Sequence, residues 1–348
     1  MTKVTLIIST DNENSIEESF RGILNQSGDN LEIICVLDDA IQLQDEYKNV
    51  VIKKYTDNQI EVMNDAIINA TGEYILFADI GSEIDFKKIE IFYNKILMDK
   101  SDVLIFNNLE DNKTMNILSR LCENKVFTYE KIYEYIFDID NTPFNKLFNR
   151  NFLIGNDLFF KNTYYLDELF YFNTLFKAKR LSFMNESVYF SYNNNLSVTD
   201  KQLFNEYISN QEDMLSLFKQ MGDEEKLIRA FDNYIINLIN KYSDLKIANK
   251  NEIYPILRHK FIRILKIDEN KFLIDNLDMQ SRKLFEQVII CESAEEYDLF
   301  HKVNEDKKYL NFMGRYKKIL TTEEKKIKRF NNSLTSSNSW RLTRIFRL

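Results

Sequence analysis

Polar and acidic side chains follow three apolar segments in the first eighty residues of the chain. Positions 9–12 read Ser-Thr-Asp-Asn, the pair Asp38 and Asp39 follows the second segment, and Asp79 follows the third. Carboxylates accept hydrogen bonds without a competing proton and can hold divalent cations, and hydroxyl and amide groups bind sugars and bases. The three clusters can therefore form one polar site, provided that the fold brings them together.

The pattern of the surrounding elements predicts that it does. Short apolar runs alternate with stretches of helical spacing, which indicates a mostly parallel, doubly wound sheet. Such sheets bind ligands in the crevice at the carboxyl ends of their strands. The strands are expected at Val4–Ser9, Leu31–Leu37, Val50–Tyr55, Glu73–Ala78 and Asp102–Asn107, and the helices at Ser15–Gln26, Asn58–Ala70 and Phe86–Met98. Gly72 follows the second of these helices, where a left-handed cap is expected.

Each cluster also has a plain structural interpretation. An aspartate after a strand often only caps the next helix or shapes a turn, and for any one position this alternative stays open. The convergence of all three at one edge favours a binding site.

Several classes of protein are disfavoured by what the sequence lacks. No G-x-G-x-x-G follows the first strand, and no G-x-x-x-x-G-K-S/T occurs, which argues against dinucleotide enzymes and P-loop ATPases. Both histidines, His259 and His301, lie in the second half, so carboxylates are left for acid–base chemistry in the first. The cysteines Cys35, Cys122 and Cys291 have no metal-binding spacing, which suggests a reducing compartment.

The order of the motifs resembles that of family-two glycosyltransferases with the GT-A fold. The opening strand and its polar end, the E-I-I-x-V-x-D segment, the A-x-G-x-Y-I-x-F-x-D segment, N-K-L-Y, E-D-x-x-F and Y-x-x-Y-R all have counterparts in the right order. They are Val4–Asn12, Leu31–Asp39 after Gln26, Asn64–Asp79, Asn145–Phe148, Tyr165–Phe170 and Tyr189–Thr199.

This resemblance implies a site for a nucleotide sugar, most often a UDP-sugar. Ser9, Asn12 and Asp38 would bind the base and ribose, and a carboxylate suits the imide N–H of uracil because it only accepts hydrogen bonds. Asp79 would face the ribose or the metal–diphosphate. The full set of implied binding residues is Ser9, Thr10, Asn12, Asp38, Asp39, Asn64 and Asp79.

The resemblance also implies a catalytic base. Asp167 aligns with the aspartate of E-D-x-x-F, which deprotonates the acceptor hydroxyl in inverting members. An aspartate is ionised near neutral pH, so it needs only placement within hydrogen-bond reach. Glu168 takes this role if the register shifts by one, and a helix cap is the structural alternative for Asp167.

The sequence departs from the family pattern at groups that neutralise the diphosphate. The usual D-x-D-D is Asp79-Ile-Gly-Ser here, and the expected arginine of the last motif is Asn193. Metal and arginine serve the same need. Asp79 then remains a weak metal ligand, Glu83 or Asp85 can substitute, and only weak dependence on Mg²⁺ or Mn²⁺ is expected. A domain that binds without catalysing is the other interpretation.

The second half predicts amphipathic helices at Leu203–Phe218, Glu224–Tyr242, Ile253–Ile267, Phe272–Cys291 and Glu295–Leu320. Residues 315–348 carry ten Lys or Arg against two Glu, so most of the acidic charge lies before them, and the total net charge is −8. The end, Thr335–Leu348, resembles the S-x-S-W-R-x-T ending of bacterial surface-glycan glycosyltransferases. We expect a catalytic domain at 1–200, a helical domain at 201–320 and a basic amphipathic tail at 321–348.

These observations predict an inverting glycosyltransferase acting on a glycan or lipid-linked acceptor for cell-surface polysaccharide. A catalytically impaired binding or scaffold subunit is the alternative, and a nucleotidyltransferase is disfavoured because its glycine-rich loop is absent. We expect a cytoplasmic protein without a signal peptide or membrane span, peripheral at the membrane through its tail, able to oligomerise and without affinity for nucleic acid.

Overall fold

The structure is a computed structural model, and it describes residues 3–10, 30–41, 50–56, 58–79, 83–107, 112–161, 168–191 and 201–302, with residues 322 and 325. The chain divides into two compact units, Met1–Leu196 and Ser197–Leu348. The predicted division into three domains, with a separate tail at 321–348, stays a prediction. The helix expected at Ser15–Gln26 lies outside the described residues.

The first unit is built on a seven-stranded sheet with the order β3-β2-β1-β4-β7-β6-β8. All neighbouring pairs are parallel except the two that β7 makes with β4 and β6. A two-stranded sheet of β5 and β9 completes the described strands of this unit. The strands are β1 Val4–Thr10, β2 Leu31–Asp38, β3 Val50–Tyr55, β4 Tyr74–Asp79, β5 Glu83–Ile84, β6 Val103–Phe106, β7 Lys146–Asn149, β8 Leu181–Met184 and β9 Tyr189–Ser191.

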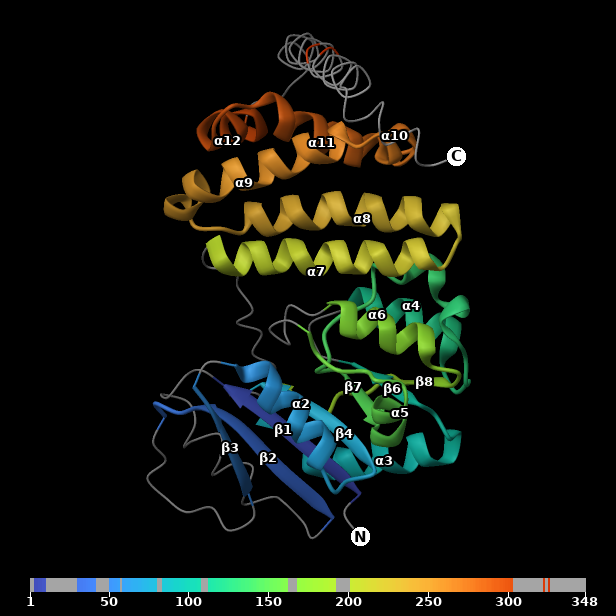
Figure 1. The fold of residues 1–348 in the computed structure, drawn as a ribbon. Helices are drawn as coiled ribbons and strands as arrows, with labels where there is room; N and C mark the ends of the chain where they lie inside the picture. The colour runs from blue at the N-terminus through green and yellow to red at the C-terminus, as the bar shows by residue number, and fades with distance from the viewer. Residues whose placement is uncertain are drawn as a thin grey trace, which may run out of the picture. The chain divides into compact units, whose positions relative to one another are not determined.

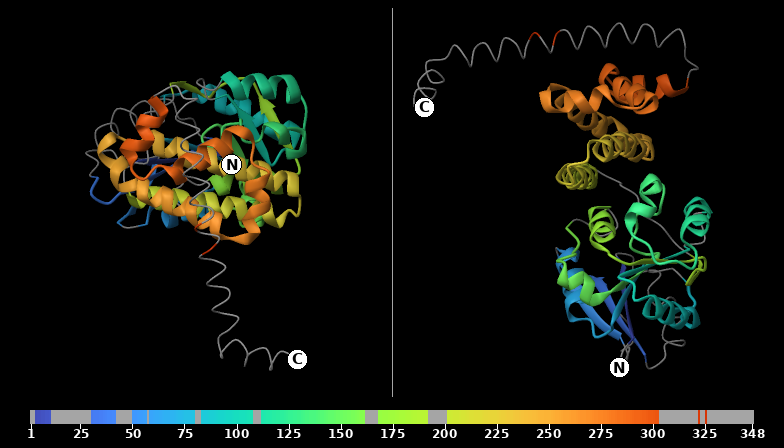
Figure 2. Two further views of the ribbon diagram at one scale, coloured as in Figure 1. Left: turned by 90° about the horizontal axis from the view of Figure 1, so that it is seen from above. Right: turned by 90° about the vertical axis from the view of Figure 1, so that its right-hand side faces the viewer.

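The predicted α/β class, a doubly wound and mostly parallel sheet, is therefore confirmed. Each of the five expected strands is present, and the residues of β1, β2 and β4 are almost all buried because helices cover both faces of the sheet (Figures 1 and 2). The helices of this unit are α2 Gln59–Asn69, α3 Phe86–Asp99, α4 Asn112–Cys122, α5 Arg150–Gly155 and α6 Glu168–Lys177, with short 3₁₀ helices η2 Tyr129–Lys131 and η3 Tyr133–Tyr135.

Gly72 does not form the expected left-handed cap. The helix α2 ends at Ala70 with φ −56° and ψ 142°, and Gly222 is the described glycine with positive φ. Gly72 is needed for another reason, because a Cβ there would lie 2.5 Å from the backbone N of Thr5 and 2.8 Å from the carbonyl carbon of Val4. The glycine allows the loop before β4 to pass directly against β1.

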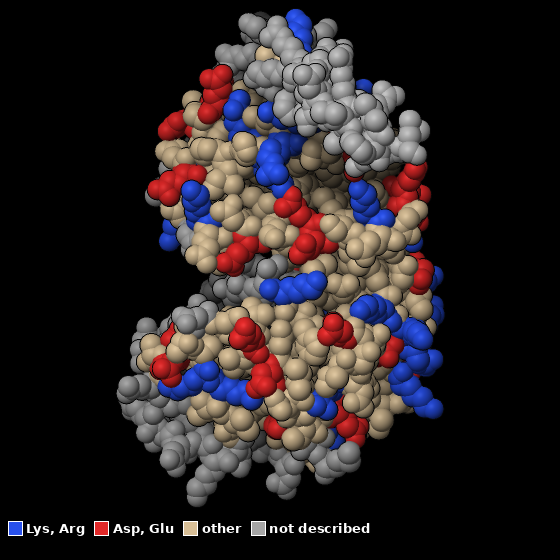
Figure 3. All heavy atoms as spheres, viewed as in Figure 1, with Lys and Arg blue, Asp and Glu red and all other residues tan. Residues whose placement is uncertain are grey.

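Every regular element that the structure describes in the second unit is a helix, as predicted. Its helices are α7 Lys201–Gln220, α8 Glu224–Ser243, α9 Ile247–Lys266, η5 Asp268–Asn270, α10 Lys271–Asp275, α11 Met279–Ile290 and α12 Ala294–Lys302. Within the described parts of the chain no helix is long and apolar enough to cross a membrane. Basic and acidic side chains are interspersed over each unit on the face shown in Figure 3.

One predicted helix of this unit is wrong. The stretch 272–291 is not one helix, because the chain turns at 276–278 and α11 starts anew after Asp278. The Asp278 carboxylate accepts hydrogen bonds from the backbone N–H and the hydroxyl of Ser281, at 2.8 and 3.0 Å. This side chain caps the first turn of α11 and so favours a new helix over continuation.

Candidate nucleotide-sugar site

The sheet brings the strand-end residues of the first unit to one edge. In the register of β1 and β4, Ser9 lies opposite Asp79, and on the other side of β1 it lies opposite Val36, two residues before Asp38. Asp38 in turn lies opposite Tyr55 of β3. The carboxyl ends of four adjacent parallel strands thus meet, as the sequence predicts, and Ser9 is buried there.

A cavity of about 390 Å³ adjoins this edge, between the turn after β2, the end of β3 and the first turns of α2. Polar and charged side chains make up most of its lining. The lining residues are Asp39, Lys54, Tyr55, Thr56, Asn58, Glu61 and Val62. Of these, only Asp39 is a site residue predicted from the sequence. The volume of the cavity is within the range of small-molecule pockets.

Lys54 holds the turn beside the cavity. Its Nζ donates hydrogen bonds to the backbone carbonyls of Asp39 and Ile41, at 3.1 and 2.9 Å, and lies 3.7 Å from Oδ1 of Asp39. The strand β3 reads V-V-I-K-K-Y, and its two lysines are the signal that could have identified Lys54. The residue places a positive charge next to the predicted base-binding carboxylates.

Asp38 shapes the same turn and keeps acceptor capacity. Its Oδ1 accepts a hydrogen bond of 2.8 Å from the backbone N–H of Ala40. Among the residues that the structure describes, no other hydrogen bond or ion pair occupies this carboxylate. Asp38 is half-buried at the strand end, so its second oxygen can accept a hydrogen bond from a ligand.

Asn64 joins two distant segments of the first unit. Its Nδ2 donates to the carbonyl of Phe160 at 2.9 Å, and its Oδ1 accepts from the N–H of the same residue at 3.0 Å. This reciprocal pair fixes the irregular segment around Phe160, which precedes the stretch containing Asp167 in the sequence. Asn64 therefore positions the segment around Phe160. Direct contact between Asn64 and a nucleotide stays a prediction.

The acidic residues predicted to hold a metal have different placements. Asp79 ends β4 and Glu83 begins β5, but the side chains of both lie outside what the structure describes. Asp85 caps α3, with its carboxylate accepting from the backbone N–H of Lys87 at 3.1 Å. In the described part of the chain no three His, Cys, Asp or Glu side chains cluster as a metal site. The metal prediction stays untested.

Of the two candidates for the catalytic base, the structure describes Glu168. Asp167, like Asn12, falls outside the described residues, and the side chain of Thr10 does too. Glu168 is the first residue of α6 and is half-buried. A helix N-terminus favours a negative charge, which suits a carboxylate that must be ionised.

A buried polar cluster around the N-K-L-Y counterpart lies near Glu168 through Tyr171. The Nζ of Lys146, in β7, donates to the carbonyls of Asp140 and Thr142 at 2.8 and 2.5 Å and to Oδ1 of Asn145 at 2.5 Å. The same ammonium lies 4.8 Å from the ring centroid of Tyr171. The N-K-L motif thus ties the loop before β7 to α6.

The Tyr171 side chain keeps its proton at neutral pH. Burial, followed by the negative charges of Asp140 and Glu168, raises the pKa of this phenol well above its usual value. Loss of the proton would add a negative charge beside two carboxylates in a buried position. Tyr171 can therefore only be a neutral hydrogen-bonding group near Glu168.

A GT-A architecture follows from these features: a mostly parallel sheet with one antiparallel strand inserted, and an acidic carboxyl edge beside a polar cavity. Residues 5–155, less than half of the chain, match the family model described as Glycosyl transferase family 2. The expected family is thereby confirmed.

A solved structure shares the fold. The crystal structure of S. aureus TarS aligns with 86% of this chain at 16% identity and a TM-score of 0.56. The alignment covers 53% of the TarS chain, so this protein spans about half the length of that relative. A structure of S. aureus TarS 1-349 in complex with UDP-GlcNAc aligns with 82% of this chain and 79% of its own, at 18% identity and a TM-score of 0.47. No curated protein matches the sequence.

Proposed function

We propose that the chain is an inverting glycosyltransferase that moves a sugar from a UDP-sugar to a growing cell-surface glycan or lipid-linked acceptor. The observation that carries the proposal is the half-buried Asp38 carboxylate with acceptor capacity at the carboxyl edge of a family 2 domain, next to the polar cavity. This is the edge at which such sheets bind ligands.

Recognition of uracil follows from the chemistry of Asp38. The imide N–H of uracil is a donor, and the oxygen of Asp38 that Ala40 leaves unoccupied is an acceptor. Cytosine has an acceptor at the same ring position, so two acceptors would face each other. The carboxylate thus favours a uridine nucleotide over a cytidine nucleotide.

Transfer itself needs a base for the acceptor hydroxyl. Asp167 takes that role in this proposal, with Glu168 as the neighbouring carboxylate at the N-terminus of α6. The base removes the hydroxyl proton while the oxygen attacks the anomeric carbon, and the bond to the diphosphate breaks on the opposite face. Asn64 supports the geometry from a distance by fixing Phe160, seven residues before Asp167.

The leaving diphosphate must be neutralised. Asp79 would hold Mg²⁺ or Mn²⁺ weakly through its one carboxylate, with Glu83 as the candidate substitute for the missing acid, because such an ion also binds phosphate oxygens. A bound ion would stabilise the charge that develops on the diphosphate. Gly81 stands where the family pattern has an acid. This departure favours a second candidate function, a sugar-nucleotide-binding subunit of a glycan-assembly complex that transfers little or no sugar.

A substitution that keeps the turn but reverses the hydrogen-bond polarity tests the base recognition. In Asp38→Asn the amide oxygen can still accept from Ala40 while the NH₂ faces the base. Calorimetric titration should show weaker UDP binding, by about tenfold, and a UDP-to-CDP affinity ratio that falls. Asp65→Asn is the matched control. Asp65 lies on α2 outside the cavity lining, and its carboxylate accepts hydrogen bonds from Lys53 and Asn69. Equal UDP affinity in Asp38→Asn and the unmodified chain would dismiss the site.

Donor hydrolysis separates the two candidate functions. Full-length protein is incubated with a panel of UDP-sugars, with and without Mn²⁺, and release of UDP is followed. Turnover supports the transferase, whereas saturable UDP binding without turnover of any donor supports the binding subunit.

The tail supplies the proposed membrane contact. Trp340, Ile345 and Phe346 alternate with arginines at 341, 344 and 347, a mixture typical of interfacial segments. These residues lie outside the described part of the chain. Basic residues near an anionic leaflet contribute roughly 1 kcal/mol each. In sedimentation with anionic vesicles, a larger fraction of the 348-residue chain than of a chain ending at residue 330 should pellet with the vesicles. Equal fractions in the pellet would remove the membrane role.

A further inference from the structure

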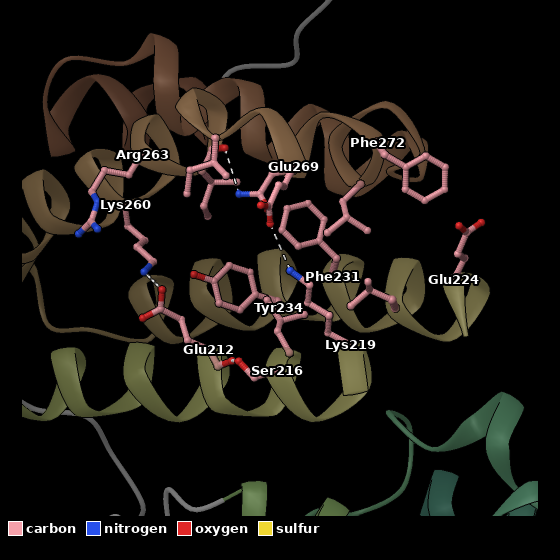
Figure 4. Close-up of a pocket in the computed structure, with 16 residues that line it drawn as sticks. Glu212, Ser216, Lys219, Glu224, Phe231, Tyr234, Lys260, Arg263, Glu269 and Phe272 are labelled. Atoms are coloured by element: carbon pink, nitrogen blue, oxygen red, sulfur yellow. Dashed lines mark hydrogen bonds and ion pairs between the residues drawn. The ribbon is translucent and has the colours of Figure 1, made fainter. Parts of the chain in front are cut away.

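The helical unit contains a pocket of about 360 Å³ that the proposed transfer reaction does not use. It is formed by α7, α8, α9, η5 and α10, so it lies entirely within the second unit (Figure 4). Its volume falls in the range of small-molecule pockets. We call it the helical pocket, and its lining residues are Glu212, Leu215, Ser216, Lys219, Glu224, Leu227, Phe231, Tyr234, Lys260, Arg263, Ile264, Ile267, Glu269, Asn270, Phe272 and Leu273.

One end of the helical pocket carries exposed apolar side chains, with the exposed carboxylate of Glu224 on the same side as Phe272 (Figure 4). Phe231 is 2% exposed and belongs to the core, while Ile267 and Phe272 on the same lining are 48% and 47% exposed. In Figure 4, Phe231 and Phe272 lie toward the end of the pocket opposite Lys260. Covering such exposed apolar area with an apolar ligand is favourable by roughly 25 cal/mol per Å².

The other end is polar and carries an excess of positive charge. Lys260 and Arg263 lie there with a single carboxylate, that of Glu212, which forms an ion pair with Lys260 (Figure 4). Among the described residues Arg263 has no ion-pair partner. Burial, and then the charge of Arg263, lowers the pKa of Lys260.

A buried hydroxyl points to the same end. Tyr234 is 1% exposed, its hydroxyl has no hydrogen-bond partner among the described residues, and in Figure 4 the hydroxyl lies toward Lys260 and Glu212. Burial raises the pKa of this phenol, so it keeps its proton and can donate. A buried donor without an acceptor is costly, and a ligand acceptor would satisfy it.

The pocket therefore has an unsatisfied donor and an unpaired cation at one end and exposed apolar side chains at the other. We propose that the helical pocket binds a single-chain amphipathic anion, with its carboxylate or phosphate monoester at Arg263 and Tyr234 and its hydrocarbon chain along Phe231 and Phe272. The exposed ion pair between Lys219 and Glu269, 3.3 Å apart and well solvated, costs little to rearrange around such a ligand. The proposal concerns the second unit only and does not rest on the proposed glycosyl transfer.

Calorimetric titration of the full-length protein with decyl phosphate, kept below its micelle concentration, tests this assignment. We expect saturable binding of one molecule per chain, with inorganic phosphate and neutral decyl maltoside at least about tenfold weaker, since each lacks one of the two interactions. Equal affinity for decyl maltoside would overturn the anion assignment, and equal affinity for inorganic phosphate would overturn the apolar one.

Two variants locate the ligand. Arg263→Gln should weaken decyl phosphate binding about tenfold, whereas Lys271→Gln, at an exposed lysine outside the pocket, should leave it unchanged. Tyr234→Phe should weaken binding roughly three- to tenfold and leave the Tm of the ligand-free protein unchanged or higher, because an unsatisfied buried hydroxyl is removed. A Tyr234→Phe protein that loses Tm but binds decyl phosphate normally would make the hydroxyl a structural group and overturn the proposal.

Discussion

Polar side chains at the amino ends and at the carboxyl ends of the strands in the large sheet have different hydrogen-bond partners. We call these two sides of the sheet the amino edge and the carboxyl edge. At the amino edge, the Glu32 carboxylate accepts from the Thr5 hydroxyl at 2.5 Å and from the N–H of Thr71 at 2.7 Å, and Gly72 N–H donates to the Thr5 hydroxyl at 3.0 Å. At the carboxyl edge, Asp38 accepts one backbone hydrogen bond and keeps the rest of its capacity. We call the amino edge closed, because its side chains and loop hydrogen-bond to one another, and the carboxyl edge open, because Asp38 retains an acceptor oxygen.

This difference separates residues that serve folding from residues that serve binding. Side chains that satisfy one another at the amino edge stabilise the folded state. At the carboxyl edge, Asp38 is held in place by a single backbone contact and retains an acceptor oxygen. Substitutions at the two edges should therefore affect different measurements, stability in one case and ligand binding or turnover in the other.

The largest effect is expected on turnover, from the residue proposed as base on the open side. Asp167→Asn keeps the size of the side chain but removes the proton acceptor, so turnover should fall about 10²–10⁴-fold while donor affinity persists. Single-turnover kinetics with a UDP-sugar measure this, and Asp157→Asn, on the loop after α5, is the control. An Asp167→Asn enzyme with full turnover would transfer the role to Glu168 or remove the motif from the mechanism.

The next effect is on stability, from the closed edge. Gly72→Ala places a Cβ within 2.5–2.8 Å of backbone atoms of Val4 and Thr5, which cannot move without disturbing β1. Overpacking of this kind costs about 1–3 kcal/mol of unfolding free energy, occasionally more. Chemical denaturation measures the loss.

Gly155 provides the matched glycine control. A Cβ at Gly155, the last residue of α5, meets no atom within 4 Å. Gly155→Ala should be neutral or stabilising by up to about 1 kcal/mol. If both alanine variants unfold alike, the close approach of Gly72 to β1 does not limit stability.

The sequence predicts much of the sheet because several of its strands are nearly continuous apolar runs. The residues of β1 and β2 need no long-range information to be recognised, and their parallel pairing follows from the helical spacing of the residues between them. The inserted strand β7 was missed because Lys146 and Asn149 break its apolar pattern, and Lys146 is buried only through contacts with Asp140 and Thr142 that tertiary structure supplies.

The candidate site was predicted less completely than the fold. Asp38 and Asp39 follow a strand and are visible in the sequence, whereas Lys54 belongs to a strand and reaches the site only because β3 pairs with β2. Asn64 was matched to a binding motif, but its reciprocal contact with Phe160, 96 residues away, cannot be read from local spacing. Local sequence patterns show which residues follow the ends of strands. Strand pairing and tertiary contacts decide which other residues reach the site.

A paired substitution compares the two edges directly. Asp38→Ala removes a charged acceptor and should weaken UDP binding by about 1.5–3 kcal/mol, roughly tenfold or more in Kd, with little loss of stability. Glu32→Ala should do the reverse, because the Thr5 hydroxyl and the Thr71 N–H lose the one oxygen that accepts both of their hydrogen bonds, and cost roughly 1–3 kcal/mol of stability while UDP affinity holds. Calorimetry gives the UDP affinity of each variant, and denaturation gives its free energy of unfolding. The same pattern of losses in both proteins would erase the distinction between the edges.

The smallest expected effect concerns the metal at the open edge. Asp79 alone offers one carboxylate, and Gly81 offers none where the family pattern has an acid. We therefore expect UDP affinity to differ less than about tenfold between EDTA and Mn²⁺, since a single carboxylate with diphosphate and water holds such an ion weakly. Gly81→Asp should enlarge the metal effect, provided that the backbone there does not need the positive φ that glycine adopts freely. Gly81→Ala controls for that backbone requirement because it adds a Cβ without an acid. A change of tenfold or more on adding Mn²⁺ to the unmodified protein would mean that Glu83, Asp85 or another acid already completes the site, and the open edge would then resemble an ordinary metal-dependent transferase.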